Sequence, residues 1–200
     1  RVGRTMTVAE VLAEVRQDLG FYRDSGGGLT LSGGEPLAQA AFAAELLAAA
    51  AAEGIHTAIE TCACAPWSAI AQLLPHCRLF IVDLKAEAAR HRELTGVPLE
   101  PIIDNLRRLH DARAVIWLRL PLIPGLTDSA KRWQEAEGLC ARLPRLARVQ
   151  IIPYHPLGLG KRQRLGQGAG TDGRPATPTA GAVQRCLDQL AAAGIMATPV

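Results

Sequence analysis

The stretch GLTLSGGEPLAQAAFAAELLAAA, residues 28–50, contains one strand, one turn and one helix in direct succession. Leucine alternates with threonine over residues 29–31, which is the two-residue period of a strand. Pro36 opens an alanine-rich helix that we expect to cover residues 37–52, and Gly54 follows in the usual position of a C-terminal cap. A strand that leads directly into a helix is the repeating unit of parallel α/β folds.

The same unit recurs along the chain, because short apolar segments alternate with longer amphipathic ones. The segments that we predict as strands are 28–31, 56–60, 78–85, 114–121 and 147–153, with a last short one at 195–200. The helices that we predict are 7–19, 37–52, 66–74, 101–110, 127 or 128 to 143, and 183–193. Thr7 is the expected N-cap of the first helix, with Glu10 at capping-box spacing. The predicted fold class is therefore α/β with a parallel sheet.

Length and composition fit one globular domain over residues 1–200, of which 48% are apolar and 20% charged. Within it, the Gly- and Pro-rich segment 157–180 lacks apolar periodicity, so we expect a long loop there. A formal charge of only +3, and an opening without a long apolar stretch, predict no nucleic-acid partner and no membrane partner. The odd number of cysteines, five, favours a reducing compartment, and the cytoplasm is the predicted location.

Polar residues stand at or just after the end of each of the first five predicted strands. In parallel βα folds the ligand lies beyond the carboxyl ends of the strands, so these positions have more functional weight than others. In strand order they are Ser32, Gly33, Gly34 and Glu35; Glu60 and Thr61; Asp83 and Lys85; Arg119; and His155. We therefore predict one binding site along this edge.

The chemistry of these residues matches an amino acid. The glycine pair 33–34 leaves the backbone open to a ligand, and Glu35 can accept hydrogen bonds from an ammonium. Lys85 and Arg119 offer positive charge to a carboxylate. Each residue also has a structural interpretation when taken alone, as a turn, an ion pair between Asp83 and Lys85, or a helix cap. Their occurrence at all five strand ends favours the binding site.

The cysteines do not have the spacing of a metal site. Cys62 and Cys64 are separated by one residue, whereas ordinary zinc sites need two to four, and Cys77 falls on a separate segment. Cys140 and Cys186 lie on apolar helical faces and are expected to be core residues. We assign no metal ligand among them.

Five segments, in this order and at these intervals, resemble the radical S-adenosylmethionine (SAM) enzymes that activate glycyl radical enzymes. This group is typified by pyruvate formate-lyase activating enzyme. The segments are TLSGGEPL, AIETC, VDLK, RLPLIPGLTD and IIPYHPLG, and DNLRRL at 104–109 is similar as well. The resemblance covers nearly the whole chain. It implies an α/β partial (β/α)6 TIM-like barrel of parallel strands with the site at its open top, here with the first βα unit missing.

The resemblance also implies how SAM would be held. The residues implied around its methionine amino group are Gly33, Gly34 and Glu35. Those implied around its carboxylate and sulfonium are Lys85 and Arg119, and His155 is implied near the adenine. Polar contacts to SAM, or to a possible monovalent cation beside its carboxylate, are implied for Glu60, Thr61 and Asp83.

In this family a [4Fe–4S] cluster reduces SAM to methionine and a 5′-deoxyadenosyl radical, which abstracts hydrogen from a glycine of the partner glycyl radical enzyme. A flavodoxin- or ferredoxin-type protein is the implied electron donor. The Cys-x3-Cys-x2-Cys motif that binds the cluster is absent from these 200 residues, so this chain alone is expected to lack radical activity. A second departure is Ala63-Cys64, where the family often has Gly-Tyr.

Three alternatives stay open. One is a radical SAM enzyme that acts on a small molecule. Another is a non-catalytic module that binds SAM or a partner protein, and the absent cluster cysteines favour it. The last is an ordinary barrel enzyme that uses Glu60, Asp83 and Lys85 as acids and bases, but it gives the Gly-Gly-Glu turn no role.

Overall fold

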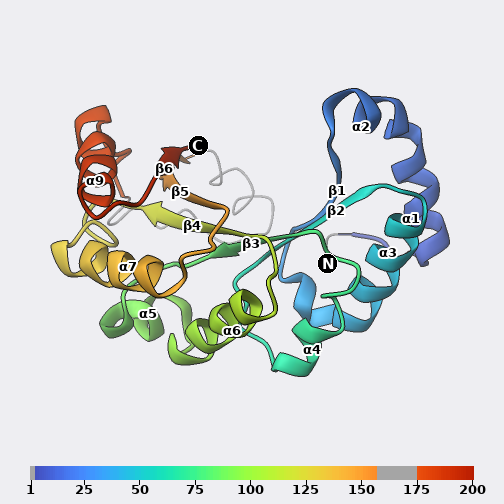
Figure 1. The fold of residues 1–200 in the computed structure, drawn as a ribbon, viewed down its shortest axis with the longest axis horizontal. Helices are drawn as coiled ribbons and strands as arrows, with labels where there is room; N and C mark the ends of the chain where they lie inside the picture. Colours follow the sequence, from blue (N-terminus) through green and yellow to red (C-terminus); the bar gives the residue numbers. More distant parts are fainter. Residues whose placement is uncertain (1–2, 157–174) are drawn as a thin grey trace. The chain divides into compact units, whose positions relative to one another are not determined.

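The computed structural model describes residues 3–156 and 175–200. Its strands form one sheet in the order β1-β2-β3-β4-β5-β6 (Figure 1). They are β1 Gly28–Leu31, β2 His56–Thr61, β3 Leu79–Asp83, β4 Ile116–Leu122, β5 Arg148–Pro153 and β6 Ala197–Pro199. Strand β2 pairs in parallel with both β1 and β3, and β5 pairs in parallel with β6. The predicted α/β class with a parallel sheet is confirmed.

Helices separate consecutive strands, as repeated βα units require. They are α1 Val8–Val15, α2 Leu19–Ser25, α3 Ala40–Ala52, α4 Trp67–Ala71, α5 Ala88–Thr95, α6 Glu100–Asp111, α7 Ala130–Arg142 and α9 Ala180–Ala192. Two 3₁₀ turns, Arg16–Asp18 and Pro36–Gln39, precede α2 and α3. None of the helices in the described part of the chain has the length and apolar character needed to cross a lipid bilayer.

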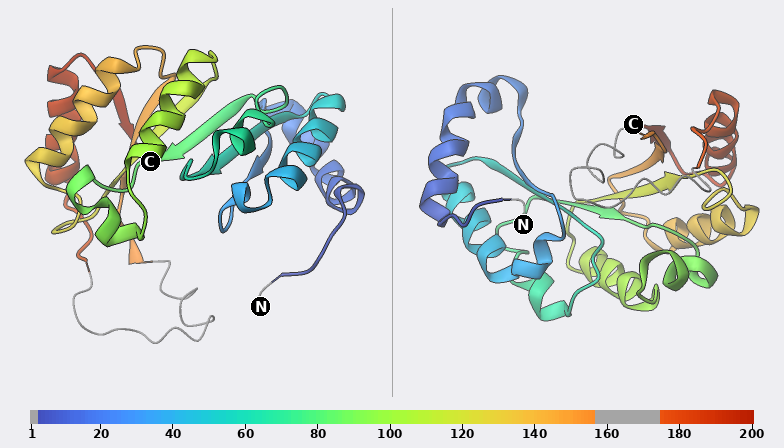
Figure 2. Two further views of the ribbon diagram at one scale, coloured as in Figure 1. Left: turned by 90° about the horizontal axis from the view of Figure 1, so that it is seen from below. Right: turned by 180° about the vertical axis from the view of Figure 1, so that it is seen from behind.

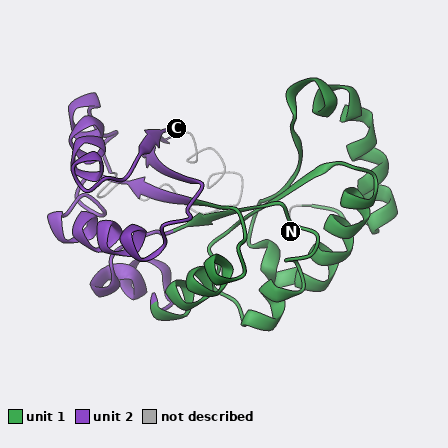
Figure 3. Cartoon of the chain, viewed as in Figure 1, with its two compact units in different colours: residues 1–83, 100–117 green, residues 84–99, 118–200 purple. Residues whose placement is uncertain are grey.

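The chain divides into two compact units (Figure 3). Unit 1 comprises residues 1–83 and 100–117, and unit 2 comprises residues 84–99 and 118–200. The single domain expected from the composition stays a prediction. The expected loop 157–180 lies outside the described residues up to position 174, and α9 already begins at Ala180.

The core of unit 1 forms where α1 packs against α3 and β1. Leu12 and Val15 of α1 are buried against Leu46 and Ala50 of α3, and Leu29 and Leu31 of β1 pack against this cluster. The capping box predicted at the start of α1 is present, because the Thr7 side chain and the Glu10 side chain each bind the other residue's backbone N–H. The apolar periodicity therefore predicted the buried face of α1 correctly.

Unit 2 has its core around β4, β5 and two helices. Side chains of β4 alternate between buried and half-buried, with Leu118, Leu120 and Leu122 almost fully enclosed. Helices α7 and α9 contact each other, and α9 also contacts β5 and β6; the helix pair can be followed in both views of Figure 2. Cys140 and Cys186 are buried in these helices, which confirms their expected place in the core.

Two helices, α2 and α5, were not predicted, because they have little buried apolar surface. The first helix ends at Val15 rather than residue 19, and the chain continues as a 3₁₀ turn and then as α2, none of whose residues is buried. Helix α5, which we did not predict, buries only His91. A pattern of apolar residues cannot reveal a helix without an apolar stripe.

Helix α7 starts later than predicted, because the residues before it close a turn. The Thr127 hydroxyl donates to Pro121 O at 2.7 Å and accepts from Ile123 N–H at 2.8 Å. Asp128 accepts from the N–H of Gly125 at 2.9 Å. With both side chains used in this way, Ser129 is the N-cap of a helix that begins at Ala130.

We expect Gly28→Ala to weaken the pairing of β1 with β2. Gly28 lies opposite His56, and a Cβ at this position would collide with the main-chain carbonyl of that residue. Overpacking of this kind lowers the free energy of unfolding by about 1–3 kcal/mol, measured by urea denaturation followed by circular dichroism. The matched control is Gly20→Ala in α2, where a Cβ meets no atom within 4 Å. An equal loss of stability in both variants would contradict the close contact.

Candidate functional site

The turn after β1 exposes main chain that no side chain covers. Gly33 has a φ of 110°, a conformation that glycine adopts without strain. A Cβ built on Gly33 or on Gly34 would meet no atom within 4 Å. The amides and carbonyls of this turn are therefore open to a ligand.

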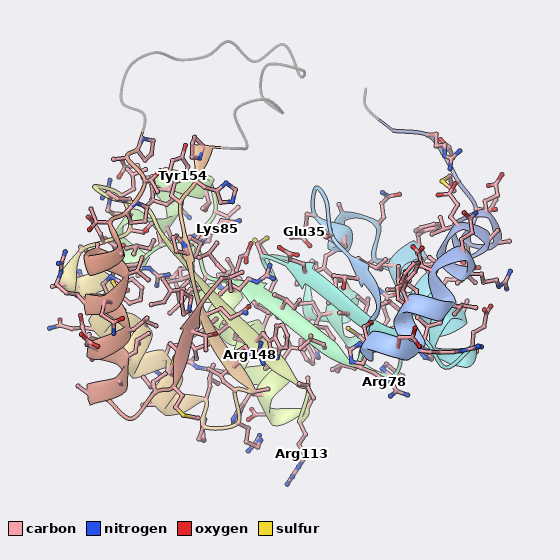
Figure 4. All side chains as sticks on the ribbon, turned by 90° about the horizontal axis from the view of Figure 1, so that it is seen from above. Glu35, Arg78, Lys85, Arg113, Arg148 and Tyr154 are labelled. Carbon is pink, nitrogen blue, oxygen red and sulfur yellow. The ribbon has the colours of Figure 1, made fainter. Side chains whose placement is uncertain are left out.

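The Glu35 carboxylate connects this turn to the end of β2. Its Oε1 accepts from the Thr61 hydroxyl at 2.6 Å and from Leu37 N–H at 3.1 Å. Its Oε2 accepts from Cys62 N–H at 2.9 Å. Figure 4 shows Glu35 at the carboxyl end of the unit 1 strands, whereas Arg78, just before β3, lies at their amino end. The side chain is thus fixed at the edge where ligands bind in such sheets.

Glu35 remains ionised at neutral pH. Partial burial acts to raise the pKa of Glu35, but the hydrogen bonds from Cys62, Thr61 and Leu37 outweigh it, so the pKa lies below the ordinary value of 4.5. A fixed, charged carboxylate next to open backbone is suited to receive a cationic group such as an ammonium.

Two cysteine thiols of unit 1, those of Cys62 and Cys77, have raised pKa values. Burial, together with a hydrogen bond to Glu35, raises the pKa of Cys62 to about 11. Burial raises the pKa of Cys77 to about 12, and its thiol donates to Leu79 O. Burial thus disfavours the thiolate form of both side chains. Within residues 3–156 and 175–200, no three His, Cys, Asp or Glu side chains are grouped so that they could hold a metal ion.

Two further acidic residues stand at the same strand ends of unit 1. Glu60, half-buried in β2, accepts from the Ser32 hydroxyl at 3.3 Å. Asp83 ends β3, one residue beyond the partner of Thr61 in the parallel register. Side-chain hydrogen bonds thus form two pairs, Ser32 with Glu60 and Thr61 with Glu35, at the ends of the neighbouring strands β1 and β2.

Lys85, Arg119 and His155 belong to unit 2. Lys85, labelled in Figure 4, is exposed, and the preceding residue, Leu84, donates its N–H to Arg119 O at 2.9 Å. Arg119 is half-buried, and its Nε donates to the side-chain oxygen of Gln150 on β5 at 3.2 Å. His155 is exposed just after β5. Lys85 and His155 follow strands, as expected, whereas Arg119 lies in the middle of β4 and not at its end, because the strand continues through Pro121 to Leu122.

A buried charge that we did not predict supports the Leu84–Lys85 segment. Arg132 of α7 is only 1% exposed, and its guanidinium donates to Leu84 O at 2.5 Å. Burial lowers the pKa of Arg132 to about 10, and Glu87 and Glu135 oppose this effect by their negative charge. Leu84 therefore has both its N–H and its carbonyl bound.

Asn105 is a second residue that the sequence analysis did not single out by itself. It lies on α6, is 5% exposed, and donates to two carbonyls of the loop after β2. A signal was present, because Asn105 occupies a position in line with Ile102, Leu106 and Leu109, the apolar face of the helix. A polar residue at such a position needs partners and so marks a structural or functional contact.

The chain is similar to known proteins of one enzyme superfamily. The family model of the radical SAM superfamily matches residues 1–133. The choline trimethylamine-lyase activating enzyme of Oleidesulfovibrio alaskensis is 38% identical over 182 residues, which are 88% of this chain and 58% of that protein. The isethionate sulfite-lyase activating enzyme of the same organism is 44% identical over 163 residues, or 80% of this chain and 52% of that protein. The chain thus spans little more than half the length of these relatives.

A solved structure has the same fold. It is the crystal structure of a domain of pyruvate-formate lyase-activating enzyme from Bacteroides vulgatus, with a TM-score of 0.73 and 29% sequence identity. The match covers 87% of this chain and 99% of that domain. This likeness confirms the predicted partial-barrel class.

We expect Arg132→Met to destabilise the protein by about 3 kcal/mol or more, because it leaves the buried Glu87 carboxylate without its neighbouring positive charge. Adding Glu87→Gln should recover part of the loss, since the second substitution removes the uncompensated charge. Urea denaturation measures both variants, with the exposed neighbour Lys131→Met as the control. A loss below about 0.5 kcal/mol for Arg132→Met, as for ordinary surface substitutions, would rule out the buried network.

We expect Glu35→Gln to lower stability at neutral pH and to have less effect in acid. A carboxyl group whose pKa is lowered by folding stabilises the protein above its unfolded pKa, near 4.5, and that contribution is lost as the pH falls through the lower folded value. Urea unfolding between about pH 3 and pH 7 shows the difference. Glu45→Gln, at an exposed position of α3, is the control. The lowered pKa is wrong if the Glu35→Gln difference is the same at both ends of this range.

Proposed function

Because the chain belongs to the radical SAM superfamily, we propose that it supplies the SAM-binding region of an enzyme that activates a glycyl radical enzyme. The observation that carries this proposal is the turn after β1, where an ionised, fixed Glu35 stands beside the open backbone of Gly33 and Gly34. The activating-enzyme relatives support the reaction class.

The residues of the turn fit the amino end of SAM. The methionine part of SAM carries an ammonium group, which needs acceptors for its hydrogens. Glu35 supplies charged oxygens, and the main chain at Gly33 and Gly34 can approach because no Cβ intervenes. Thr61 contributes to binding the ammonium indirectly. Its hydroxyl donates to Glu35 and is therefore not available to a ligand.

We assign the remaining contacts with SAM from the sequence resemblance to the family. Glu60 and Asp83 are assigned to polar contacts with SAM or with a monovalent cation beside its carboxylate. Lys85 and Arg119 are assigned to the carboxylate and sulfonium end, and His155 to the adenine. The segment that carries Lys85 is held by Arg132, which fixes the main chain at Leu84.

The iron–sulfur cluster has no ligand set in this chain. The sequence contains no Cys-x3-Cys-x2-Cys motif, and Cys62 and Cys64 do not have its spacing. When bound, SAM and a [4Fe–4S] cluster supply the radical chemistry of the family. The role that we propose for the residues described is to bind and orient SAM.

The proposed partners follow from the reaction class. A glycyl radical enzyme is the proposed protein substrate, and a flavodoxin- or ferredoxin-type protein the proposed electron donor. Five free cysteines support a reducing compartment, and the cytoplasm is the proposed location. A second candidate function, a SAM-binding module without radical chemistry, is favoured by the missing cluster cysteines.

We expect Glu35→Ala and Lys85→Ala each to weaken SAM binding by more than about tenfold, because each removes a charge-assisted contact worth about 1.5–3 kcal/mol. Isothermal titration calorimetry with SAM measures the affinity. Two matched controls at exposed positions, Glu45→Ala and Lys131→Ala, should bind SAM as the wild type does.

Two results would contradict this assignment. Unchanged affinity in both Glu35→Ala and Lys85→Ala would show that SAM, if bound, is held elsewhere. If only Glu35→Ala loses affinity, the assignment of Glu35 to the amino group is supported and the assignment of Lys85 to SAM is wrong.

A further inference from the structure

Helix α6 carries a buried polar side chain on its apolar face. Ile102, Leu106 and Leu109 are fully buried, and Asn105 lies in line with them. A buried amide is unfavourable unless its hydrogen-bonding groups are used. The position of Asn105 therefore depends on what its side chain binds.

The Asn105 amide joins two carbonyls of the loop between β2 and α4. Its Nδ2 donates to Ala63 O and to Ala65 O, at 2.9 Å in each case. Both groups are acceptors, so the nitrogen end of the amide has to face them. A single side chain thus uses both of its N–H donors on one short segment.

This segment contains a residue that needs such support. Ala63 has a φ of 55°, in the left-handed region that a residue with a Cβ rarely adopts, and it is fully buried. Strained residues persist only where the surrounding contacts determine their conformation. Here the N–H of Ala63 donates to the Thr61 hydroxyl at 2.9 Å, and its carbonyl is held by Asn105. The residue is therefore fixed on both sides.

The same segment holds the Glu35 carboxylate. Thr61, which accepts from Ala63, donates its own hydroxyl proton to Glu35 at 2.6 Å. Cys62, directly before Ala63, donates its N–H to the other carboxylate oxygen at 2.9 Å. A continuous series of hydrogen bonds therefore runs from α6 to Glu35, entirely within unit 1.

We propose that Asn105 is a positioning residue for the amino end of SAM. It fixes residues 61–65 in the conformation that presents the Thr61 hydroxyl and the Cys62 N–H to Glu35, and it does not contact the ligand. This inference rests on the proposed function, because it assigns Glu35 to the SAM ammonium. The proposed effect of Asn105 is limited to the binding of the amino end of SAM.

The test compares Asn105→Ala with Leu109→Ala, which removes a buried side chain from the same helix but no hydrogen bond, since a leucine side chain makes none. We expect Asn105→Ala to bind SAM about three- to tenfold more weakly, in the range of other indirect couplings. Affinity for 5′-methylthioadenosine, which lacks the amino acid part of SAM, should stay within about twofold of the wild type. Leu109→Ala should bind both ligands normally despite its lower stability.

A double variant establishes whether the effect passes through Glu35. In the Glu35→Ala background, the further change Asn105→Ala should alter SAM affinity by less than about twofold, since the group to be positioned is gone. The inference is overturned if the loss is undiminished in that background, if both ligands lose affinity equally, or if Leu109→Ala produces the same pattern. Asn105→Asp, which keeps the side-chain shape, repeats the comparison if the alanine variant does not fold.

A readout without SAM separates this inference from the proposed function. Carbon-13 NMR of the Glu35 carboxyl follows its titration directly, and we expect its pKa to rise in Asn105→Ala and not in Leu109→Ala. If the wild type binds no SAM, the proposed function fails, and a raised pKa still supports the positioning of Glu35. An unchanged pKa overturns the positioning role, whatever the affinity for SAM.

Discussion

The hydrogen bonds between Glu35 and the end of β2 are the interaction on which the site in unit 1 depends. Glu35 follows two glycines that have no side chain to keep the turn in place, so the turn is fixed through its carboxylate. Thr61 and Cys62 supply the donors because they end the neighbouring parallel strand. A charged acceptor is thereby held at the carboxyl edge of the sheet, where a ligand can reach the open backbone beside it.

Polar residues behind the site have a supporting role in both units. In unit 1, Asn105 holds the loop after β2, in which Ala63 has a left-handed backbone conformation. In unit 2, Arg132 holds the main chain at Leu84, next to Lys85. Each supporting residue comes from a helix and binds main-chain carbonyls. Helices thus fix the loops that follow strands by means other than apolar packing.

The elements that the sequence predicted well are those with a regular apolar pattern. The predicted bounds of β1, β2, β5 and α6 agree closely with the structure. Leu29, Ile59 and Leu106 are examples of apolar residues in these elements that pack in the core. Helix α5 escaped prediction because it buries only His91, and the start of α7 was misplaced because the side chain of Thr127 closes a turn. The candidate site residues were predicted from their place at strand ends, and this placement holds for Glu60, Thr61 and Asp83 but not for Arg119, which lies in the middle of β4. The supporting residue Arg132 was not predictable, since a tertiary hydrogen bond leaves no period in the sequence, whereas Asn105 left a signal as a polar residue on the apolar face of α6.

Membership of the radical SAM superfamily supports the proposed reaction class, and the described residues support the part that we propose for this chain, the binding of SAM. In this proposal Glu35, with its open glycine turn, receives the ammonium of SAM, whereas these 200 residues contain no Cys-x3-Cys-x2-Cys motif for the cluster. Amide NMR during a titration with SAM tests the proposed SAM site most directly. The account predicts the largest chemical-shift changes at the N–H groups of Gly33, Gly34 and Cys62. A titration that leaves these three signals unmoved would contradict it.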